Sequence, residues 1–296
     1  MSADAMDKNM PQSEPNSLSH VARKSAVCVL IGHSIEALTS AVVLASLGQR
    51  VHLYADQELL AQQLQQYGFE HHLQALWQMY TQQQDIVSYA LPNTADELIQ
   101  CYEGANHNDS HIIRERQEVN KPKTVALYWV FLGSIDSVWI EDDWLSAFNH
   151  SHQQAQPLIM SGIKQLGTIA ALSQRLKRAW VYYLPFVFLK DGDAYSSMLN
   201  PSLWLLGEKM PNSRHHLDML QPLMQHARAT YYADIATIEF ARSSIMAMLA
   251  TRVSFMNEMS RLADSQQVDI QQVSHIMGLD ERVGSSYLQA GWGFGG

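Results

Sequence analysis

The segment spanning residues 26–56 constrains the fold of this chain more than any other. It runs from an apolar stretch through a turn at Gly32 into an apolar-periodic helix that Gly48 ends, and then into a second apolar stretch, Val-His-Leu-Tyr. A strand, a helix and a strand in this order form a βαβ unit with two parallel strands. Further short apolar runs at 86–90, 125–132, 158–160 and 179–184 alternate with helical segments. The sequence therefore predicts an α/β fold with a Rossmann-like, doubly wound parallel sheet.

A long helix is predicted in the C-terminal part of the chain. Residues 230–266 contain neither Gly nor Pro and carry apolar residues at helical spacing. A helix of this length would span roughly 50 Å, which is more than a small domain needs. Apolar residues lie on more than one of its faces and indicate burial on several sides. We therefore expect an all-α dimerisation segment in which two copies of the chain form a homodimer through the 230–266 helix.

These patterns divide the chain into three parts. Residues 1–24 are polar, include Pro11 and Pro15, and are expected to be a disordered tail. Residues 25–211 form the predicted Rossmann-like domain of the NAD-binding type, and residues 212–296 the helical dimerisation domain.

Composition excludes several classes of function. A net charge of -9 offers no basic surface for nucleic acid. Apolar runs fall short of the ~20 residues that span a bilayer, so we expect no membrane partner and a cytoplasmic location. The two cysteines, Cys28 and Cys101, predict no disulfide, and the histidines show no spacing typical of a metal site.

The turn after the first strand departs from a dinucleotide-binding turn. That turn needs G-x-G-x-x-G/A, because the pyrophosphate rests on bare backbone at a helix N-terminus. Gly32 and Ala37 satisfy the first and third positions, but Ser34 replaces the second glycine and Glu36 adds negative charge. The acid that binds the ribose is displaced by one residue, to Asp56. We therefore predict weak or absent NAD binding at Gly32, Ser34, Ala37 and Asp56.

Three motifs near the C-terminus carry a resemblance to a known family. The runs LATRVSFMNE (249–258), DERVG (280–284) and GWGFGG (291–296) are similar to L-A-x-K-I-S-F-x-N-E, D-x-R-I-G and G-x-G-F-G-G of the UDP-glucose/GDP-mannose dehydrogenases. Upstream, FLKDGDA (188–194) resembles the family's F-L-R-E-G-x-A. The resemblance extends from about residue 26 to the end. It implies NAD as cofactor and a nucleotide sugar as ligand.

The resemblance also identifies catalytic positions that have changed. The family's P-E-F-L motif carries a glutamate that acts in hydrolysis, and the matching residue here is Val187. A lysine and an asparagine of the long helix support the family's reaction, and here they are Arg242 and Met246. The family's cysteine nucleophile follows G-x-G-F-G-G-S, beyond Gly296. We therefore expect no catalytic residues in this chain.

The substrate-binding positions implied by the resemblance are Arg282, Gly293 and Gly295. The family's D-x-R-I-G arginine reaches toward substrate across the dimer interface. Arg282 has an alternative role, a helix-end salt bridge to Asp280 or Glu239.

Three functions remain open at this point. The first is a catalytically inactive dimeric scaffold or interaction protein linked to sugar-nucleotide or polysaccharide metabolism. The second is an NAD-dependent nucleotide-sugar 6-dehydrogenase whose cysteine and C-terminal domain are missing from this chain. The third is a non-catalytic sensor of a nucleotide or sugar nucleotide.

Overall fold

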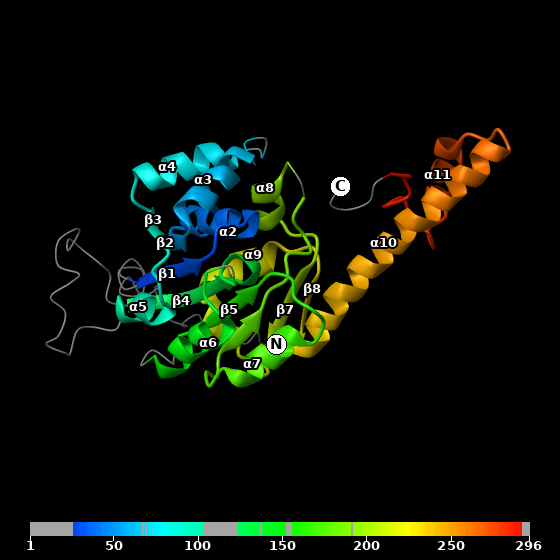
Figure 1. Cartoon of the computed structure of the whole chain (residues 1–296). Helices are drawn as coiled ribbons and strands as arrows, with labels where there is room; N and C mark the ends of the chain where they lie inside the picture. Colours follow the sequence, from blue (N-terminus) through cyan, green and yellow to red (C-terminus); the bar gives the residue numbers. More distant parts are fainter. Residues whose placement is uncertain are drawn as a thin grey trace, which may run out of the picture.

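The computed structural model consists of an α/β body from which a helical arm extends (Figure 1). It describes residues 26–66, 68, 70, 72–102, 124–136, 138–151, 156–190 and 192–291. The tail expected at 1–24 and the motif residues Gly293 and Gly295 lie outside the described residues.

An eight-stranded sheet with the order β3-β2-β1-β4-β5-β6-β7-β8 forms the centre of the body. The strands are β1 (Ala26–Ile31), β2 (Arg50–Ala55), β3 (Ile86–Ala90), β4 (Thr124–Phe131), β5 (Leu158–Ser161), β6 (Val181–Tyr183), β7 (Trp204–Glu208) and β8 (Thr230–Asp234). Within the described residues, β6 and β7 are the one pair of neighbouring strands that runs antiparallel. The predicted α/β, Rossmann-like fold is confirmed.

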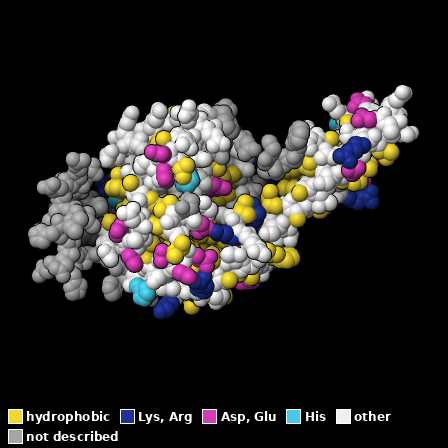
Figure 2. All heavy atoms as spheres, viewed as in Figure 1, with side chains coloured by type: hydrophobic (Ala, Val, Ile, Leu, Met, Phe, Trp, Pro, Cys, Tyr) yellow, Lys and Arg dark blue, Asp and Glu magenta, His cyan; other side chains and the backbone are white. Residues whose placement is uncertain are grey.

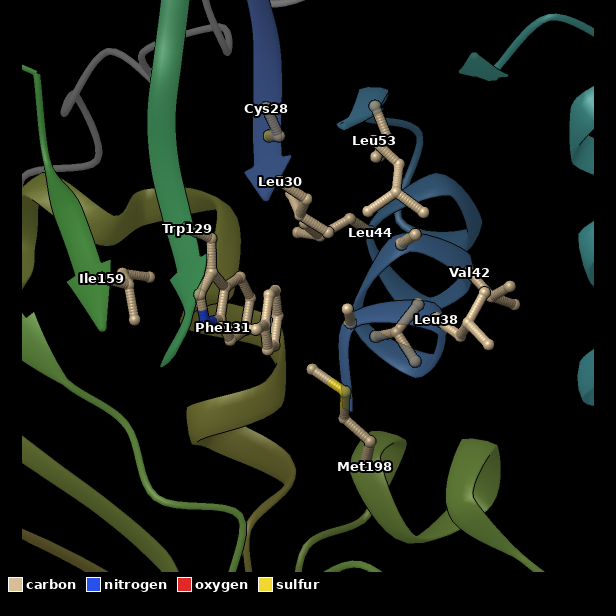
Figure 3. Close-up of a cluster of buried hydrophobic side chains, with 14 of the residues drawn as sticks. Cys28, Leu30, Leu38, Val42, Leu44, Leu53, Trp129, Phe131, Ile159 and Met198 are labelled. Carbon is tan, nitrogen blue, oxygen red and sulfur yellow. The ribbon is translucent and has the colours of Figure 1, made fainter. Parts of the chain in front are cut away.

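Helices cover both faces of the sheet, which explains why β1 and β4 are almost continuously apolar. The helices of the body are α2 (Ile35–Ser46), α3 (Gln57–Gln66), α4 (Leu73–Gln82), α5 (Ala95–Gln100), α6 (Glu141–His150), α7 (Thr168–Arg175), α8 (Ala194–Leu199) and α9 (Gln221–His226), with 3-10 turns η1 (Leu132–Ser134) and η2 (Arg214–Leu220). Side chains of β1, β4, α2 and α8 meet in one of the two apolar layers (Figure 3).

Two strands of the sheet were not predicted from the sequence. The strands β7 and β8 extend the sheet to Asp234, past the domain boundary expected at residue 211. Residues 230–234, expected as helix, form β8 because Thr and Tyr side chains suit a pleated surface better than a helix. The helix begins at Ile235, where the Asp234 carboxylate accepts a hydrogen bond from the Thr237 amide at 2.9 Å.

The arm consists of α10 (Ile235–Ser265) and α11 (Ile270–Leu279). The 31 residues of α10 would span about 46 Å at 1.5 Å per residue. The first turns of α10 pack on the body, and the rest projects away from it to α11 at the far end (Figure 1).

Candidate functional site

The turn after β1 lies where the order of strands reverses, between β2 and β4. Ligands of open α/β sheets bind outside the carboxyl ends of the strands at this point. The Gly32 amide donates to the Tyr54 carbonyl at 2.9 Å, and Gly32 has a φ of 142°. A Cβ atom here would lie 2.8 Å from the Cβ atom of Phe131. Packing and backbone conformation therefore both require this glycine.

Ser34, in place of the second glycine, begins α2. Its hydroxyl accepts a hydrogen bond from the amide of Ala37 at 3.4 Å. His33 beside it is half-buried, and burial lowers the pKa of its imidazole. The negative charge of Asp56 acts in the opposite direction and offsets part of this shift. The turn is thus held by its own side chains, and Ser34 uses one of the amide donors that a pyrophosphate would need.

Asp56 follows β2, but its carboxylate serves the next helix. One oxygen, Oδ1, accepts hydrogen bonds from the amides of Glu58 and Leu59, each at 3.0 Å. The structure therefore brings Gly32, Ser34 and Asp56 to the same end of the sheet, while Asp56 also caps α3.

Two buried glutamates, Glu70 and Glu239, cap the N-termini of two further helices. No pattern in the sequence predicts either contact. The Glu70 carboxylate accepts hydrogen bonds from the amides of Gly192 and Ala194 at 2.9 Å each. These two amides begin α8, 122 and 124 residues away along the chain. A contact between residues so far apart leaves no periodicity to detect.

Glu239 plays the same part for α7. Its two carboxylate oxygens accept from the amides of Ile169 and Ala170 at 3.0 Å each, and only 3% of its surface is exposed. This contact fixes the start of α10 against the body.

Val187 lies in an apolar environment. It is half-buried and packs against both apolar layers of the sheet. Its side chain can neither accept nor donate a proton, so no general base stands at this position.

Arg242 and Met246 stand one turn apart on α10, and both are half-buried. Burial raises the pKa of the nearby Tyr183 hydroxyl to about 12, and the positive charge of Arg242 opposes that shift. Arg242 therefore lies near the carboxyl end of β6. Its charge is retained there, whereas Met246 provides no useful hydrogen bond.

Neither cysteine is placed to act as a nucleophile in this site. Cys28 is 1% exposed inside β1, and burial raises the pKa of its thiol to about 12. Cys101 is exposed at the end of α5. The reactive form of a cysteine is the thiolate, which burial suppresses at Cys28.

Arg282 pairs with Asp280 within the chain. The guanidinium donates to both carboxylate oxygens, at 3.0 and 2.7 Å, and the Arg282 side chain is 90% exposed. The Asp280 alternative is thus present, and the Glu239 alternative is excluded because α7 occupies that carboxylate.

A cavity of about 240 Å³ lies away from this site, between α7 and the start of α10. Its charged lining residues are engaged with the protein: Glu208 binds Arg214, Lys209 donates to the Leu176 carbonyl, and Asp234 caps α10. No residue of the turn after β1 lines this cavity, so the two features are separate.

The motif residues of the arm hold its distal end together. The Asn257 side chain exchanges two hydrogen bonds with Gly291, at 3.0 and 2.8 Å, and the Arg252 guanidinium donates to the Gly284 carbonyl at 3.0 Å. Residues 236–296 match the central domain of the UDP-glucose/GDP-mannose dehydrogenase family. The C-terminal part of the chain therefore belongs to this family.

Individual relatives are similar to part of the chain in sequence, and solved structures are similar to it in fold. A UDP-glucose 6-dehydrogenase of Rickettsia bellii is 34% identical over 113 residues, which cover 37% of this chain and 25% of that enzyme. A solved UDP-glucose dehydrogenase from Pyrobaculum islandicum superposes with a TM-score of 0.66 at 19% identity, covering 96% of this chain and 62% of its own. A solved GDP-mannose dehydrogenase from Pseudomonas aeruginosa gives 0.63 at 15%, covering 91% and 61%.

The matched part of this chain thus spans 25% of the Rickettsia bellii enzyme and less than two thirds of each of the two solved chains. Within the described residues, no helix combines the length and hydropathy needed to cross a bilayer. The same residues contain no group of three or more His, Cys, Asp or Glu side chains that could hold a metal ion.

Proposed function

We propose that this chain is a dimeric, non-catalytic relative of the nucleotide-sugar dehydrogenases that serves as a scaffold or interaction protein. The observation that carries the proposal is the exposure of α10. From Phe240 to Phe255 no residue of this helix is buried within one chain. A helix with apolar residues and no partner would expose a large apolar surface to water, at a cost that grows with area.

Three exposed apolar side chains of α10, Met248, Phe255 and Leu262, form a stripe, which we call the arm stripe. Met248, Phe255 and Leu262 are exposed by 61%, 48% and 55% and follow one another at intervals of seven residues. Hydrophobic side chains along the arm are visible in Figure 2. A seven-residue interval is the spacing with which two packed helices meet along a seam. A second copy of the arm across a two-fold axis would cover the same stripe on both chains.

The changed catalytic positions support the absence of turnover. Val187 removes a proton acceptor, and Met246 removes an amide. A missing general base alone slows a reaction by about 10²- to 10⁴-fold. These changes affect separate steps, so one partner residue could not restore them together.

NAD and nucleotide sugars are ligands that the family resemblance implies, and the proposed scaffold function requires neither. Ser34 and Asp56 cap the first turns of α2 and α3. Their side-chain oxygens therefore compete with a diphosphate for the same backbone amides. Weak or absent NAD binding is therefore expected. A cytoplasmic location stays a prediction.

The test is the oligomeric state of the chain and of two matched variants. Light scattering at micromolar concentration should give twice the chain mass for the unmodified protein and the chain mass for Phe255→Asp. Ile163→Asp is the control, because Ile163 is 65% exposed on a loop of the body, outside the arm stripe. A monomeric unmodified protein, or a Phe255→Asp variant that stays dimeric, would exclude the arm as the interface.

A further inference from the structure

The cavity between α7 and the start of α10 lies far from the carboxyl ends of the parallel strands. The strand β7 runs antiparallel to β6, and Glu208 at its carboxyl end pairs with Tyr182. The amide of the next residue, Lys209, donates to the carbonyl of Val181 at 2.9 Å. Because Val181 is the first residue of β6, Lys209 is held beside the amino end of that strand. The cavity is therefore separate from the edge at which open α/β sheets bind their ligands.

Lys209 lines this cavity with a half-buried side chain. Its ammonium donates to the carbonyl of Leu176, the residue that follows α7. Within the described part of the chain it forms no ion pair, whereas the other half-buried lysine there, Lys164, pairs with Asp136. Burial lowers the pKa of the Lys209 ammonium, because water no longer fully solvates its charge. An uncharged amine is therefore more accessible at Lys209 than at a lysine in water.

Two carboxylates also line the cavity, and both are bound elsewhere. Glu208 accepts hydrogen bonds from the backbone amide of Arg214 at 2.7 Å and from its guanidinium at 3.2 Å. Asp234 accepts from the amide and the hydroxyl of Thr237, at 2.9 and 2.6 Å. Neither carboxylate forms an ion pair with Lys209. No neighbouring anion thus holds the Lys209 amine in its charged form.

The remaining lining is mostly apolar and encloses a small volume. The apolar side chains are Ala170, Ala171, Ile235 and Ala236, and the polar ones are Ser173 and Gln174. The volume of about 240 Å³ is below the roughly 300–1,000 Å³ of sites for drug-sized ligands. A lysine that is desolvated in an apolar pocket is a nucleophile toward carbonyl carbon. The cavity therefore fits a small carbonyl compound.

We propose that the Lys209 amine captures a small hydroxyaldehyde in this cavity as an imine. The uncharged amine adds to the aldehyde carbon, and a C–N bond forms. The carbonyl oxygen then leaves as water with two protons, so the ammonium and the aldehyde together give a protonated imine and water, without any change of oxidation state. The one remaining N–H can still donate to the Leu176 carbonyl. The polar groups of Ser173 and Gln174 favour an aldehyde that carries hydroxyl groups. The inference does not depend on the proposed scaffold function.

The experiment treats the full chain with D-glyceraldehyde and cyanoborohydride, which reduces the imine to a stable amine. Peptide mass spectrometry then measures the rate of modification at each lysine. Near neutral pH, Lys209 should react severalfold faster than the exposed Lys177. This ratio should shrink as the pH rises toward about 10.4, the ordinary pKa of lysine, because exposed amines then also lose their protons. Propanal, which has the same number of carbon atoms and no hydroxyl group, should show a smaller preference for Lys209.

Variants separate the amine from the cavity. Lys209→Arg should lose the modification at this position, because a guanidinium stays protonated. Ala171→Leu narrows the cavity and leaves the amine in place. It should slow modification of Lys209 by about 10-fold or more, the usual effect of a small steric mismatch in a pocket, and leave Lys177 unchanged. Ala179→Leu is the matched control, because Ala179 is exposed and does not line the cavity.

Four outcomes would overturn the proposal: equal rates at Lys209 and Lys177 in the unmodified chain, an unchanged Lys209 rate in Ala171→Leu, an equal preference with propanal, or protection of Lys209 by inorganic phosphate at constant ionic strength. The last result would make the cavity an anion site. Melting temperatures check that each variant folds. The comparison of Lys209 with Lys177 needs no variant, so it decides the matter even where Ala171→Leu is unstable.

Discussion

Phe131 occupies the space that any side chain at position 32 would need, since a Cβ atom on Gly32 would lie 2.8 Å from the Cβ atom of Phe131. The end of β4 thus packs directly behind the turn that follows β1. The first glycine of a dinucleotide-binding turn is usually explained by the tight turn that precedes the cofactor site. Here the packing of the protein on itself is a sufficient reason, so Gly32 is no evidence for NAD.

Replacing Gly32 with alanine should therefore destabilise the chain more than the same change at Gly48. Both glycines have a positive φ, but only Gly32 meets a neighbouring atom within 3 Å. Overpacking typically costs about 1–3 kcal/mol. The measurement is the urea midpoint of the two variants. Equal midpoints would mean that β4 moves away from the turn without cost.

The turn also predicts the response to NAD. Calorimetric titration should detect no micromolar binding to the unmodified chain, because the Ser34 hydroxyl takes an amide of α2 and Glu36 adds negative charge. Ser34→Gly should bind NAD more tightly than the unmodified chain if crowding is the obstacle. No NADH should form with UDP-glucose or GDP-mannose in either protein. NADH production by the unmodified chain would contradict the proposed loss of catalysis.

The fold could be predicted from the sequence where one continuous segment shows both the apolar run and the turn residue that define an element. Gly48 ends α2 with a φ of 77°, as expected of a glycine after a helix, and β1 to β6 follow the apolar runs. By contrast, β7 and β8 were missed, and the helix was started too early, at Thr230. The strand Thr230–Asp234 borders a helix with similar apolar content, so periodicity alone placed no boundary between them.

Only part of the site could be predicted. The positions Val187, Arg242 and Met246 followed from motifs, but the caps by Glu70 and Glu239 depend on contacts between distant segments. The spacing of apolar residues along the helix also did not predict which of them are exposed. Met248 and Leu249 are adjacent in the sequence, yet only Met248 belongs to the exposed arm stripe.

The two cysteines should differ in reactivity. At pH 8 a thiol reagent should modify the exposed Cys101 within the folded chain and leave Cys28 intact, because burial raises the Cys28 pKa to about 12. Counting modified thiols by mass spectrometry is the measurement. Rapid modification of Cys28 without denaturant would mean that β1 opens.

The same raised pKa makes stability depend on alkaline pH. An unfolded Cys28 ionises near pH 9, but the folded thiol ionises only near pH 12. Protonation therefore favours the folded state fully below about pH 9, and this contribution is lost as the pH rises toward 12. The free energy of unfolding should fall across this window, and Cys28→Ala should reduce the slope. An unchanged slope would assign the loss to other groups, such as Tyr182 and Tyr183, whose pKa values burial also raises to about 12.

Glu239 links the arm to the body, and its removal should affect both. In Glu239→Gln one carboxylate oxygen becomes an amide NH₂, which cannot accept from the amide of Ile169 or Ala170. An unsatisfied buried donor costs about 1–3 kcal/mol, which corresponds to a drop in Tm of about 2–4 °C per kcal/mol. Glu258→Gln is the control, because Glu258 lies on the same helix, 64% exposed, in an ion pair with Arg261. Surface pairs of this kind contribute about 0–1 kcal/mol. Amide hydrogen exchange should show faster exchange at the start of α7 in Glu239→Gln alone. Equal melting temperatures and equal exchange in the two variants would mean that other contacts hold α10 to the body.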